Sequence, residues 1–237
     1  MAGYFITGTD TDVGKTVVTS LLTAYFQRAG VNVFPYKPIQ SGAISENGEL
    51  QAPDVQMYQR VLPSLEPTKA CTYLLKKPSS PHLAAQEENI RFDISMVHHN
   101  ASQLQTEHDL VLVEGAGGLI VPLKEGYCML DFMKELKLPV ILVARAGLGT
   151  INHTVLSVMA LKQANISIAG ILLNRLHEED PTIENDNAVM IERLTNVPVL
   201  GTVPHLNNLD DTFKNEHSLK GIFKEMNLDR LKGETTV

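Results

Sequence analysis

The sequence predicts an α/β fold in which helices cover both faces of a mainly parallel sheet. Apolar runs alternate with segments of helical periodicity along the 237 residues, and this order is typical of parallel strands joined by helices. Runs such as 110–113 and 140–143 are continuously aliphatic, as strands buried on both faces are. The first run leads directly into a glycine-rich turn and Gly-Lys-Thr, the order found in P-loop proteins. The expected fold class is therefore P-loop NTPase-like.

The individual elements follow from these patterns in chain order. Strands are expected in the aliphatic or β-branched runs at 4–8, 31–37, 109–114, 139–144, 168–174 and 199–203. Helices are expected where apolar residues recur at helical spacing, at 15–29, 92–106, 149–164, 184–195 and 217–227. The polar, glycine-bearing stretch 40–52 is expected to be a surface loop. No linker-like segment divides the chain, so residues 1–237 are expected to form one domain.

Residues 8–16, Gly-Thr-Asp-Thr-Asp-Val-Gly-Lys-Thr, predict a phosphate-binding loop between the first strand and the first helix. Backbone N–H groups and a helix N-terminus there form a cradle for anions. Lys15 adds a positive charge for the β- and γ-phosphates, and the Thr16 hydroxyl is a natural ligand for Mg²⁺. Five residues separate Gly8 from Gly14, where four are usual. A chance Gly-Lys-Thr is disfavoured because a strand pattern precedes it and a helix pattern follows it.

Composition excludes several classes of partner. The net charge is −7, from 20 Lys and Arg against 27 Asp and Glu, and the basic residues are dispersed, so no nucleic-acid footprint is expected. The longest apolar stretches, 138–144 and 166–173, are too short to cross a membrane. Cys71 and Cys128 lie far apart without metal-ligand spacing, which is typical of a reducing compartment. We therefore expect a cytoplasmic protein with no nucleic-acid or membrane partner.

Polar side chains end two of the predicted strands, at the sheet edge where α/β proteins bind ligands. Glu114 ends one strand and precedes a run of glycines; it either holds Mg²⁺, directly or through water, or is a solvated strand-end acid. The phosphate loop favours the first interpretation. Lys37 ends another strand. It either converges with Lys15 on a reaction that passes negative charge between oxygens, or is a solvated charge.

Three further polar residues have open interpretations. Asp54 follows Pro53, and the residues alone favour a helix-start acid that complements the helix dipole. Asn174 ends a strand, and its amide either faces the edge of adenine or caps a turn. His82 has no Ser or Asp partner pattern and is interpreted as a loop histidine.

Three motifs together resemble the dethiobiotin synthetase family. They are the long-spaced phosphate loop at 8–16, Tyr-Lys-Pro at 36–38 followed by Ser41-Gly42, and Val-Glu-Gly-Ala-Gly-Gly at 113–118. Shorter matching segments lie at 80–82, 138–143, 149–153 and 201–204. The resemblance covers about residues 3–206, and the combination of motifs is specific.

The resemblance implies an ATP- and Mg²⁺-dependent ligase of biotin biosynthesis. The implied reaction joins CO₂ to 7,8-diaminopelargonic acid and closes a cyclic urea, giving dethiobiotin, ADP and phosphate. One amine captures CO₂ as a carbamate, the carbamate attacks the γ-phosphate, and the second amine closes the ring and expels phosphate. The family members are homodimers in which the tail of the diamine reaches the partner subunit.

The resemblance also implies roles for individual residues. Lys15 and Lys37 are implied to be catalytic, and Thr16, Asp54 and Glu114 to bind Mg²⁺. The implied nucleotide contacts are Asp12, Val13, Gly14, Lys15, Thr16, Val17, Glu114, Gly115, Ala116, Gly117, Asn174, Pro204, His205 and Leu206. The implied diamine contacts are Thr11, Ser41, Gly117 and Gly118, together with Thr150, Ile151 and Asn152 of the second chain. The alternative for the last three is that they only cap a core helix.

Two other classes of protein share the predicted fold. Partition and septum-positioning ATPases place a lysine five residues before the loop lysine, but Asp10 occupies that position here, and no basic face or amphipathic tail is evident. An amidotransferase-type cobyrinate synthase would carry a glutaminase domain, and this chain has neither the length nor a Cys-His pattern for one.

Overall fold

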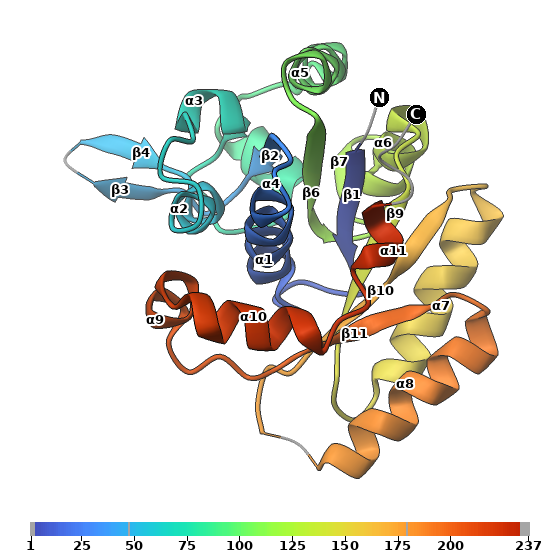
Figure 1. Cartoon of the computed structure of the whole chain (residues 1–237). Helices are drawn as coiled ribbons and strands as arrows, with labels where there is room; N and C mark the ends of the chain where they lie inside the picture. The colour runs from blue at the N-terminus through green and yellow to red at the C-terminus, as the bar shows by residue number, and fades with distance from the viewer. Residues whose placement is uncertain (1–2, 47, 179, 233–237) are drawn as a thin grey trace.

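Seven parallel strands form the central sheet of the computed structural model, which describes residues 3–46, 48–178 and 180–232 (Figure 1). The strand order is β11-β10-β9-β1-β6-β2-β5. The predicted P-loop NTPase-like α/β fold is confirmed. The strands of this sheet are β1 (Gly3–Gly8), β2 (Val33–Gln40), β5 (Cys71–Leu74), β6 (Leu110–Gly118), β9 (Val140–Arg145), β10 (Ile168–Asn174) and β11 (Val199–Val203).

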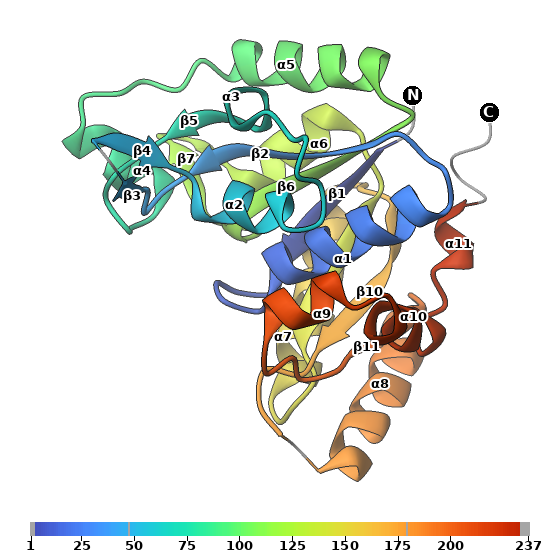
Figure 2. The same cartoon turned by 60° about the vertical axis from the view of Figure 1, so that its left-hand side comes forward.

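Helices cover both faces of the sheet (Figures 1 and 2). Successive side chains of β1 alternate between two cores, because strand residues point to opposite faces. Tyr4 and Ile6 pack in the core that contains α1, whereas Phe5 packs in the other core, edge-on to Phe132 of α6 at 5.9 Å between ring centroids. The helices are α1 (Lys15–Arg28), α2 (Pro53–Gln59), α3 (Pro67–Ala70), α4 (Pro81–Glu87), α5 (Ile94–Glu107), α6 (Met129–Leu136), α7 (Thr150–Gln163), α8 (Pro181–Thr195), α9 (Leu209–Lys214), α10 (Glu216–Lys224) and α11 (Asp229–Lys232).

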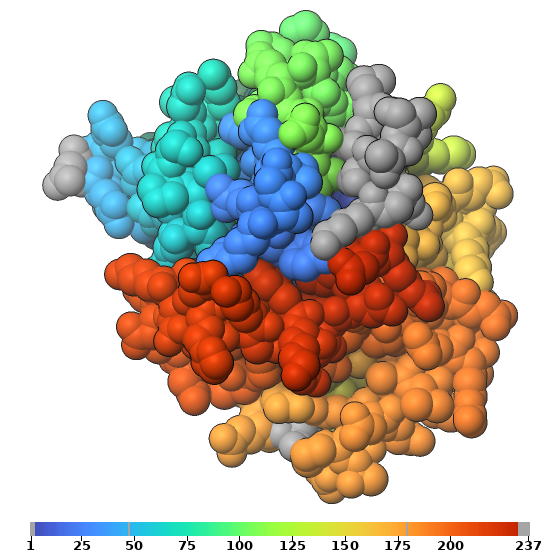
Figure 3. Space-filling model, in the orientation of Figure 1, coloured from blue at the N-terminus to red at the C-terminus, as the bar shows by residue number. Residues whose placement is uncertain are grey.

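The C-terminal segment returns to the first helix. In Figure 3 the red surface of α9 and α10 lies against the blue surface of α1. Tyr25 of α1 and Phe223 of α10 meet edge-to-face at 5.3 Å between ring centroids. Further along, the Tyr4 hydroxyl donates to the Leu231 carbonyl at 2.6 Å. The last part of the described chain thus closes the core on the α1 side. Within the described ranges, none of the helices combines the length and apolar character needed to cross a bilayer.

All the strands predicted from the sequence are present, but several short elements were missed. The expected loop at 40–52 was wrong in detail, because it contains an exposed hairpin of β3 (Ile44–Glu46) and β4 (Glu49–Gln51). A second hairpin joins β7 (Pro122–Lys124) and β8 (Tyr127–Cys128), and the edge strand β5 was not predicted. The helices α2, α3, α4, α6, α9 and α11 were also missed. These helices have between four and eight residues, too few for a helical period to be distinct. The interpretation of His82 as a loop histidine was wrong, because it lies in the first turn of α4.

Parallel pairing brings the predicted site residues to one edge of the sheet. β6 lies between β1 and β2. Ile6 of β1 is level with Glu114, and Tyr36 of β2 is level with Val113, so Lys37 and Glu114 lie level on neighbouring strands. The predicted strand ends at 37 and 114 were too early, because β2 continues to Gln40 and β6 to Gly118. The phosphate loop leaves the same edge after β1. The fold therefore places a lysine, a glutamate and the anion cradle side by side.

We predict that Gly201→Ala destabilises the fold while Gly221→Ala does not. Gly201 has φ of +143°, and a Cβ there would lie 2.8 Å from the Glu225 carbonyl oxygen and 2.9 Å from the Met226 Cα. Backbone atoms cannot move aside cheaply, so the free energy of unfolding in urea is expected to fall by about 1–3 kcal/mol.

Gly221, in the middle of α10, is the matched control because a Cβ there meets no atom within 4 Å. Alanine should raise the free energy of unfolding by about 0.5–1 kcal/mol, since it restricts the unfolded chain. Equal effects at the two positions would contradict the close approach of β11 to residues 225–226.

Candidate functional site

The phosphate loop is an open anion cradle whose shape is fixed by a side chain at the end of β10. Gly14 is the N-cap of α1 with φ of +94°, and no side chain of the described residues caps the helix there, so its first N–H groups face the loop. A Cβ at Gly14 would lie 1.9 Å from Asn174 Nδ2. That amide donates to the Val13 carbonyl at 3.0 Å. The end of β10 therefore holds the loop and requires glycine at its last position.

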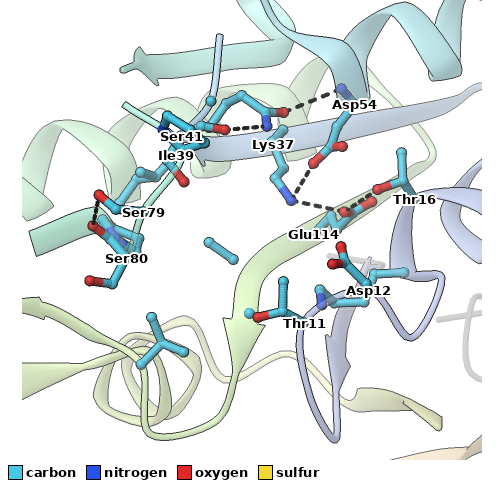
Figure 4. A pocket seen from close by; sticks show the side chains of 18 of the residues that line it. Thr11, Asp12, Thr16, Lys37, Ile39, Ser41, Asp54, Ser79, Ser80 and Glu114 are labelled. Atoms are coloured by element: carbon cyan, nitrogen blue, oxygen red, sulfur yellow. Dashed lines mark hydrogen bonds and ion pairs between the residues drawn. The ribbon is translucent and has the colours of Figure 1, made fainter. Parts of the chain in front are cut away.

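Lys37 is the centre of a buried charge cluster, shown in Figure 4. Its Nζ lies 2.6 Å from Asp54 Oδ2 and 2.8 Å from Glu114 Oε1, and it donates to the Gly115 carbonyl at 3.0 Å. The Thr16 hydroxyl donates to the same Glu114 oxygen at 2.9 Å. β2, α2, β6 and α1 thus each contribute one polar group to a single point.

The charges of this cluster stabilise one another. Burial by itself lowers the pKa of Lys37, but the carboxylates of Glu114 and Asp54 outweigh it and raise that pKa above its ordinary value. Burial raises the pKa of Asp54, yet the Lys37 ammonium outweighs it and holds that pKa below its ordinary value. The lysine and the aspartate are therefore both ionised at neutral pH, as the chemistry of a phosphate site requires.

The buried Lys15 ammonium lies in the phosphate loop, where an anion would stabilise its charge. Burial, and secondarily the charge of Lys37, lower its pKa to about 8. Its Nζ donates to the Asp10 carbonyl at 2.9 Å within its own loop. A phosphate bound in the cradle would supply the negative charge that this buried ammonium lacks.

A cavity of about 800 Å³ extends from the phosphate loop over the charge cluster to the turn at 78–81 (Figure 4). Twelve of the predicted site residues line it, and its volume suits a ligand of nucleotide size. They are Thr11, Asp12, Gly14, Lys15, Thr16, Val17, Lys37, Ser41, Asp54, Glu114, Ala116 and Gly117. Further lining residues that the sequence did not single out include Ile39, Gln40, Pro78, Ser79 and Val121.

The other predicted site residues lie outside that lining. The Val13 side chain is buried in the core with α1, and Gly115 takes part through its carbonyl. Gly118 packs beside the start of the phosphate loop. A Cβ added at Gly118 would lie 3.5 Å from the Gly8 carbonyl oxygen. The Asn174 side chain forms a hydrogen bond with the phosphate loop. The residue predicted to face adenine thus has a structural role in the loop, and its contact with adenine stays a prediction. Pro204, His205 and Leu206 follow β11, the strand that pairs with β10 at this edge.

The predicted diamine contacts at 150–152 form the first turn of α7, separate from the cavity of the same chain. Gly149 caps this helix with φ of +86° and without a side-chain hydrogen bond. The buried Asn187 amide donates to the carbonyls of Ala146 (2.9 Å) and Gly147 (3.2 Å) and so fixes the preceding loop. The Thr150 N–H donates to the Gly147 carbonyl at 3.3 Å. Its predicted role in binding a carboxylate therefore competes with a contact inside its own loop.

Sequence reasoning missed two residues that touch the charge cluster. The Tyr58 hydroxyl donates to Glu114 Oε2 at 2.6 Å, and Gln40 Oε1 accepts from the Asp54 N–H at 3.3 Å. A signal for Tyr58 existed, because it lies four residues after Asp54 in a helix that begins with Pro53. Two such residues share one helix face.

Comparisons with known proteins decide the family. Residues 2–212 match a family model described as an AAA domain. A curated protein of Halalkalibacterium halodurans named ATP-dependent dethiobiotin synthetase is 50% identical over 97% of this chain and 95% of its own length. The chain belongs to the dethiobiotin synthetase family. A second dethiobiotin synthetase, from Anoxybacillus flavithermus, is 44% identical over 88% of this chain and 94% of its own length.

Solved structures show the fold that this dethiobiotin synthetase family member shares with other ATPases. The septum site-determining protein MinD of Pyrococcus horikoshii, complexed with Mg-ADP, aligns with a TM-score of 0.60 at 19% identity over 99% of each chain. A ParA family ATPase of Chlorobium tepidum aligns with a TM-score of 0.57 at 12% identity, over 100% of this chain and 99% of its own. At these identities the likeness concerns architecture alone.

We predict that nucleotide binding takes up a proton at Lys15. With a pKa of about 8, roughly half of the Lys15 side chains are neutral at pH 8 in the free protein, and the phosphates of ATP favour the charged form. Uptake of about 0.5 proton per site is expected at pH 8, increasing toward pH 9. Titration calorimetry in two buffers of different ionisation enthalpy measures it.

Lys15→Arg is the control for this measurement, because a guanidinium stays charged throughout this pH range. The uptake should vanish in that variant if it still binds nucleotide. Equal uptake in the two proteins would assign the proton to another group.

Proposed function

We propose that this chain is an ATP-dependent dethiobiotin synthetase that joins CO₂ to 7,8-diaminopelargonic acid and closes the cyclic urea of dethiobiotin. The observation that carries the proposal is the buried Lys37 between two carboxylates, with only β6 between its strand and the strand that leads into the phosphate loop, in a member of this family. In this reaction a carbamate oxygen attacks the γ-phosphate and ADP leaves. The second amine then attacks the carbamoyl carbon, closes the ring and expels phosphate.

The two lysines address the main physical obstacle, which is repulsion between two anions. A carbamate and a triphosphate approach each other only if nearby cations offset their charges. Lys15 lies in the anion cradle after β1, and Lys37 lies on β2, on the other side of β6, with its charge maintained by Asp54 and Glu114. The ring closure is intramolecular, so correct orientation can contribute roughly 7–11 kcal/mol to lowering the barrier. The protein's own work is to hold geometry and neutralise charge.

Thr16, Asp54 and Glu114 would hold Mg²⁺. Their oxygen donors fit this hard cation, and the Lys37 ammonium between the two carboxylates indicates that positive charge is favoured there. Across residues 3–46, 48–178 and 180–232, no three His, Cys, Asp or Glu side chains group as a metal site. Mg²⁺ typically takes one or two carboxylates and completes its shell with phosphate and water. When bound, the ion would neutralise charge on the phosphates.

Asn174 and the segment 204–206 are proposed to form the adenine site. Asn174 uses one amide N–H on the Val13 carbonyl. A side-chain amide carries a second N–H and an acceptor oxygen, which together complement the edge of adenine. Pro204, His205 and Leu206 follow the neighbouring strand.

A homodimer is supported by the outer face of α7. The exposed fraction is 56% for Leu156 and 60% for Met159, which lie three residues apart in α7, and 79% for Leu148, which lies in the loop just before the helix. Such an apolar patch is typical of an interface. We propose that a second copy packs here and that the amides of Thr150, Ile151 and Asn152 bind the carboxylate of the diamine held by the partner.

The proposal also covers the domain organisation and the cellular location of the chain. Residues 1–237 form one P-loop α/β domain, which is supported by the single seven-stranded sheet; residues 1–2, 47, 179 and 233–237 lie outside the described residues. The protein acts in the cytoplasm, which is supported by the free thiols of Cys71 and Cys128.

The decisive experiment is a phosphate-release assay with purified protein. ATP, Mg²⁺, bicarbonate and the diamine together should release phosphate, and omission of the diamine should leave only slow hydrolysis. Lys15→Ala should lower the rate by about 10²–10³, because a preorganised charge is lost. Robust diamine-independent ATPase activity stimulated by DNA or lipid would instead support a partition-type ATPase.

We predict that Asn152→Asp weakens binding of the diamine without affecting ATP. The change is isosteric and exposed, and it places a negative charge in the first turn of α7 beside the proposed carboxylate site. The diamine KM should rise by about tenfold, equivalent to roughly 1.4 kcal/mol of repulsion. Steady-state kinetics with each substrate varied in turn measures the KM for the diamine and the KM for ATP separately.

Gln163→Glu is the matched control, since it makes the same amide-to-carboxylate change at the other end of α7. It should leave both KM values unchanged. An unchanged diamine KM in a dimeric Asn152→Asp protein would mean that the carboxylate is bound elsewhere.

A further inference from the structure

Glu114 accepts hydrogen bonds on both of its carboxylate oxygens. It is 1% exposed, so each oxygen needs a donor from the protein or a ligand. Oε1 accepts from the Thr16 hydroxyl at 2.9 Å and from Lys37 Nζ at 2.8 Å. Oε2 accepts from the Tyr58 hydroxyl at 2.6 Å. One oxygen therefore faces the charge cluster, while the other is bound to a residue with no role in the proposed reaction.

Helix α2 delivers two groups to the cluster at once. Asp54 lies in its first turn and reaches Lys37, and Tyr58 lies one turn later and reaches Glu114. Residues four apart share one face of a helix. The Tyr58 ring is fully buried in the core that also contains Tyr36, so the hydroxyl has a fixed direction of approach. Packing thus determines where the hydrogen bond is made.

The Tyr58 hydroxyl donates its proton toward Glu114, because the oxygens of a carboxylate only accept hydrogen bonds. The distance of 2.6 Å between the two oxygens is that of a hydrogen bond to a charged acceptor. Such a hydrogen bond is stronger than one between neutral groups.

We propose that Tyr58 is a positioning residue that fixes the Glu114 carboxylate so that Oε1 faces Thr16, Lys37 and the divalent cation. This inference rests on the proposed function, in which Glu114 is a magnesium ligand. Without the phenol, Oε2 is left without this donor. The carboxylate can then rotate, and its hydrogen bonds with Thr16 and Lys37 change with it. Partners of metal ligands typically contribute 10–100-fold to metal affinity or activity.

Tyr58→Phe is the direct test, because it removes the hydroxyl and keeps the ring in the core. The protein is saturated with ADP, and Mn²⁺ is titrated as the probe with its free concentration read by electron paramagnetic resonance. We expect Mn²⁺ to bind 10–100-fold more weakly than in the wild type, with ADP affinity in the absence of metal unchanged. Activity should recover toward the wild-type rate as Mg²⁺ is raised.

Two further variants separate the metal effect from a loss of packing. Tyr4→Phe removes another buried phenol, which donates to the Leu231 carbonyl far from the cluster, and should leave Mn²⁺ affinity unchanged. Tyr58→Met also lacks the hydroxyl but fills the space flexibly, and should show the same loss of Mn²⁺ affinity whatever its melting temperature.

The outcomes distinguish this inference from the proposed function. Wild-type protein that binds no Mn²⁺ with ADP would contradict the magnesium role of the cluster itself. Wild-type protein that binds Mn²⁺, with equal affinity in Tyr58→Phe or Tyr58→Met, would overturn the role of Tyr58 alone. A loss that follows melting temperature across the three variants, rather than absence of the Tyr58 hydroxyl, would also overturn it.

Discussion

The ion triad of Lys37, Asp54 and Glu114 is the constraint on which the rest of the site depends. A charge in the interior is tolerated only when it is paired and hydrogen-bonded, and removal of one partner from a buried pair typically costs about 3–5 kcal/mol. Lys37 is 4% exposed and Glu114 is 1% exposed, so the polar groups of the cluster must supply the partners that water would otherwise supply. The C-terminal halves of β2 and β6 and the start of α2 must therefore meet at one point. That meeting creates a concentrated, fixed electrostatic environment beside the phosphate loop.

The phosphate loop is connected to the same framework through the neighbouring strands. Asn174 at the end of β10 binds the Val13 carbonyl, and its own carbonyl accepts from the Ala146 N–H at 2.9 Å. Asn187 of α8 binds the carbonyls of Ala146 and Gly147. The loop and the start of α7 are thus held by hydrogen bonds that share one strand end. In a homodimer this arrangement would fix the nucleotide of one subunit relative to the surface that serves its partner.

The sequence predicted the parts of the fold that are long or chemically distinctive. The central strands were recognisable because buried parallel strands are continuously apolar, and the phosphate loop because its chemistry is local. The helix α2 has seven residues and the edge strand β5 has four, which is too short for either period to be visible. The convergence of Lys37 with Asp54 came only from the family resemblance. The spacing of Asp54 and Tyr58 indicates that they share a helix face, but it does not indicate that this face meets Glu114, which is 56 positions from Tyr58.

The central claim is that this cluster brings a carbamate oxygen to the γ-phosphate, and an isotope experiment tests it most directly. The purified protein is given ATP, Mg²⁺, the diamine and CO₂ labelled with ¹⁸O. The reaction is stopped before the CO₂ exchanges its label with water, and the released phosphate is analysed by mass spectrometry. If the carbamate attacks the γ-phosphate, each phosphate released with dethiobiotin carries one labelled oxygen. Phosphate without label, formed at the same rate as ADP, would show that water is the nucleophile and would contradict the assignment.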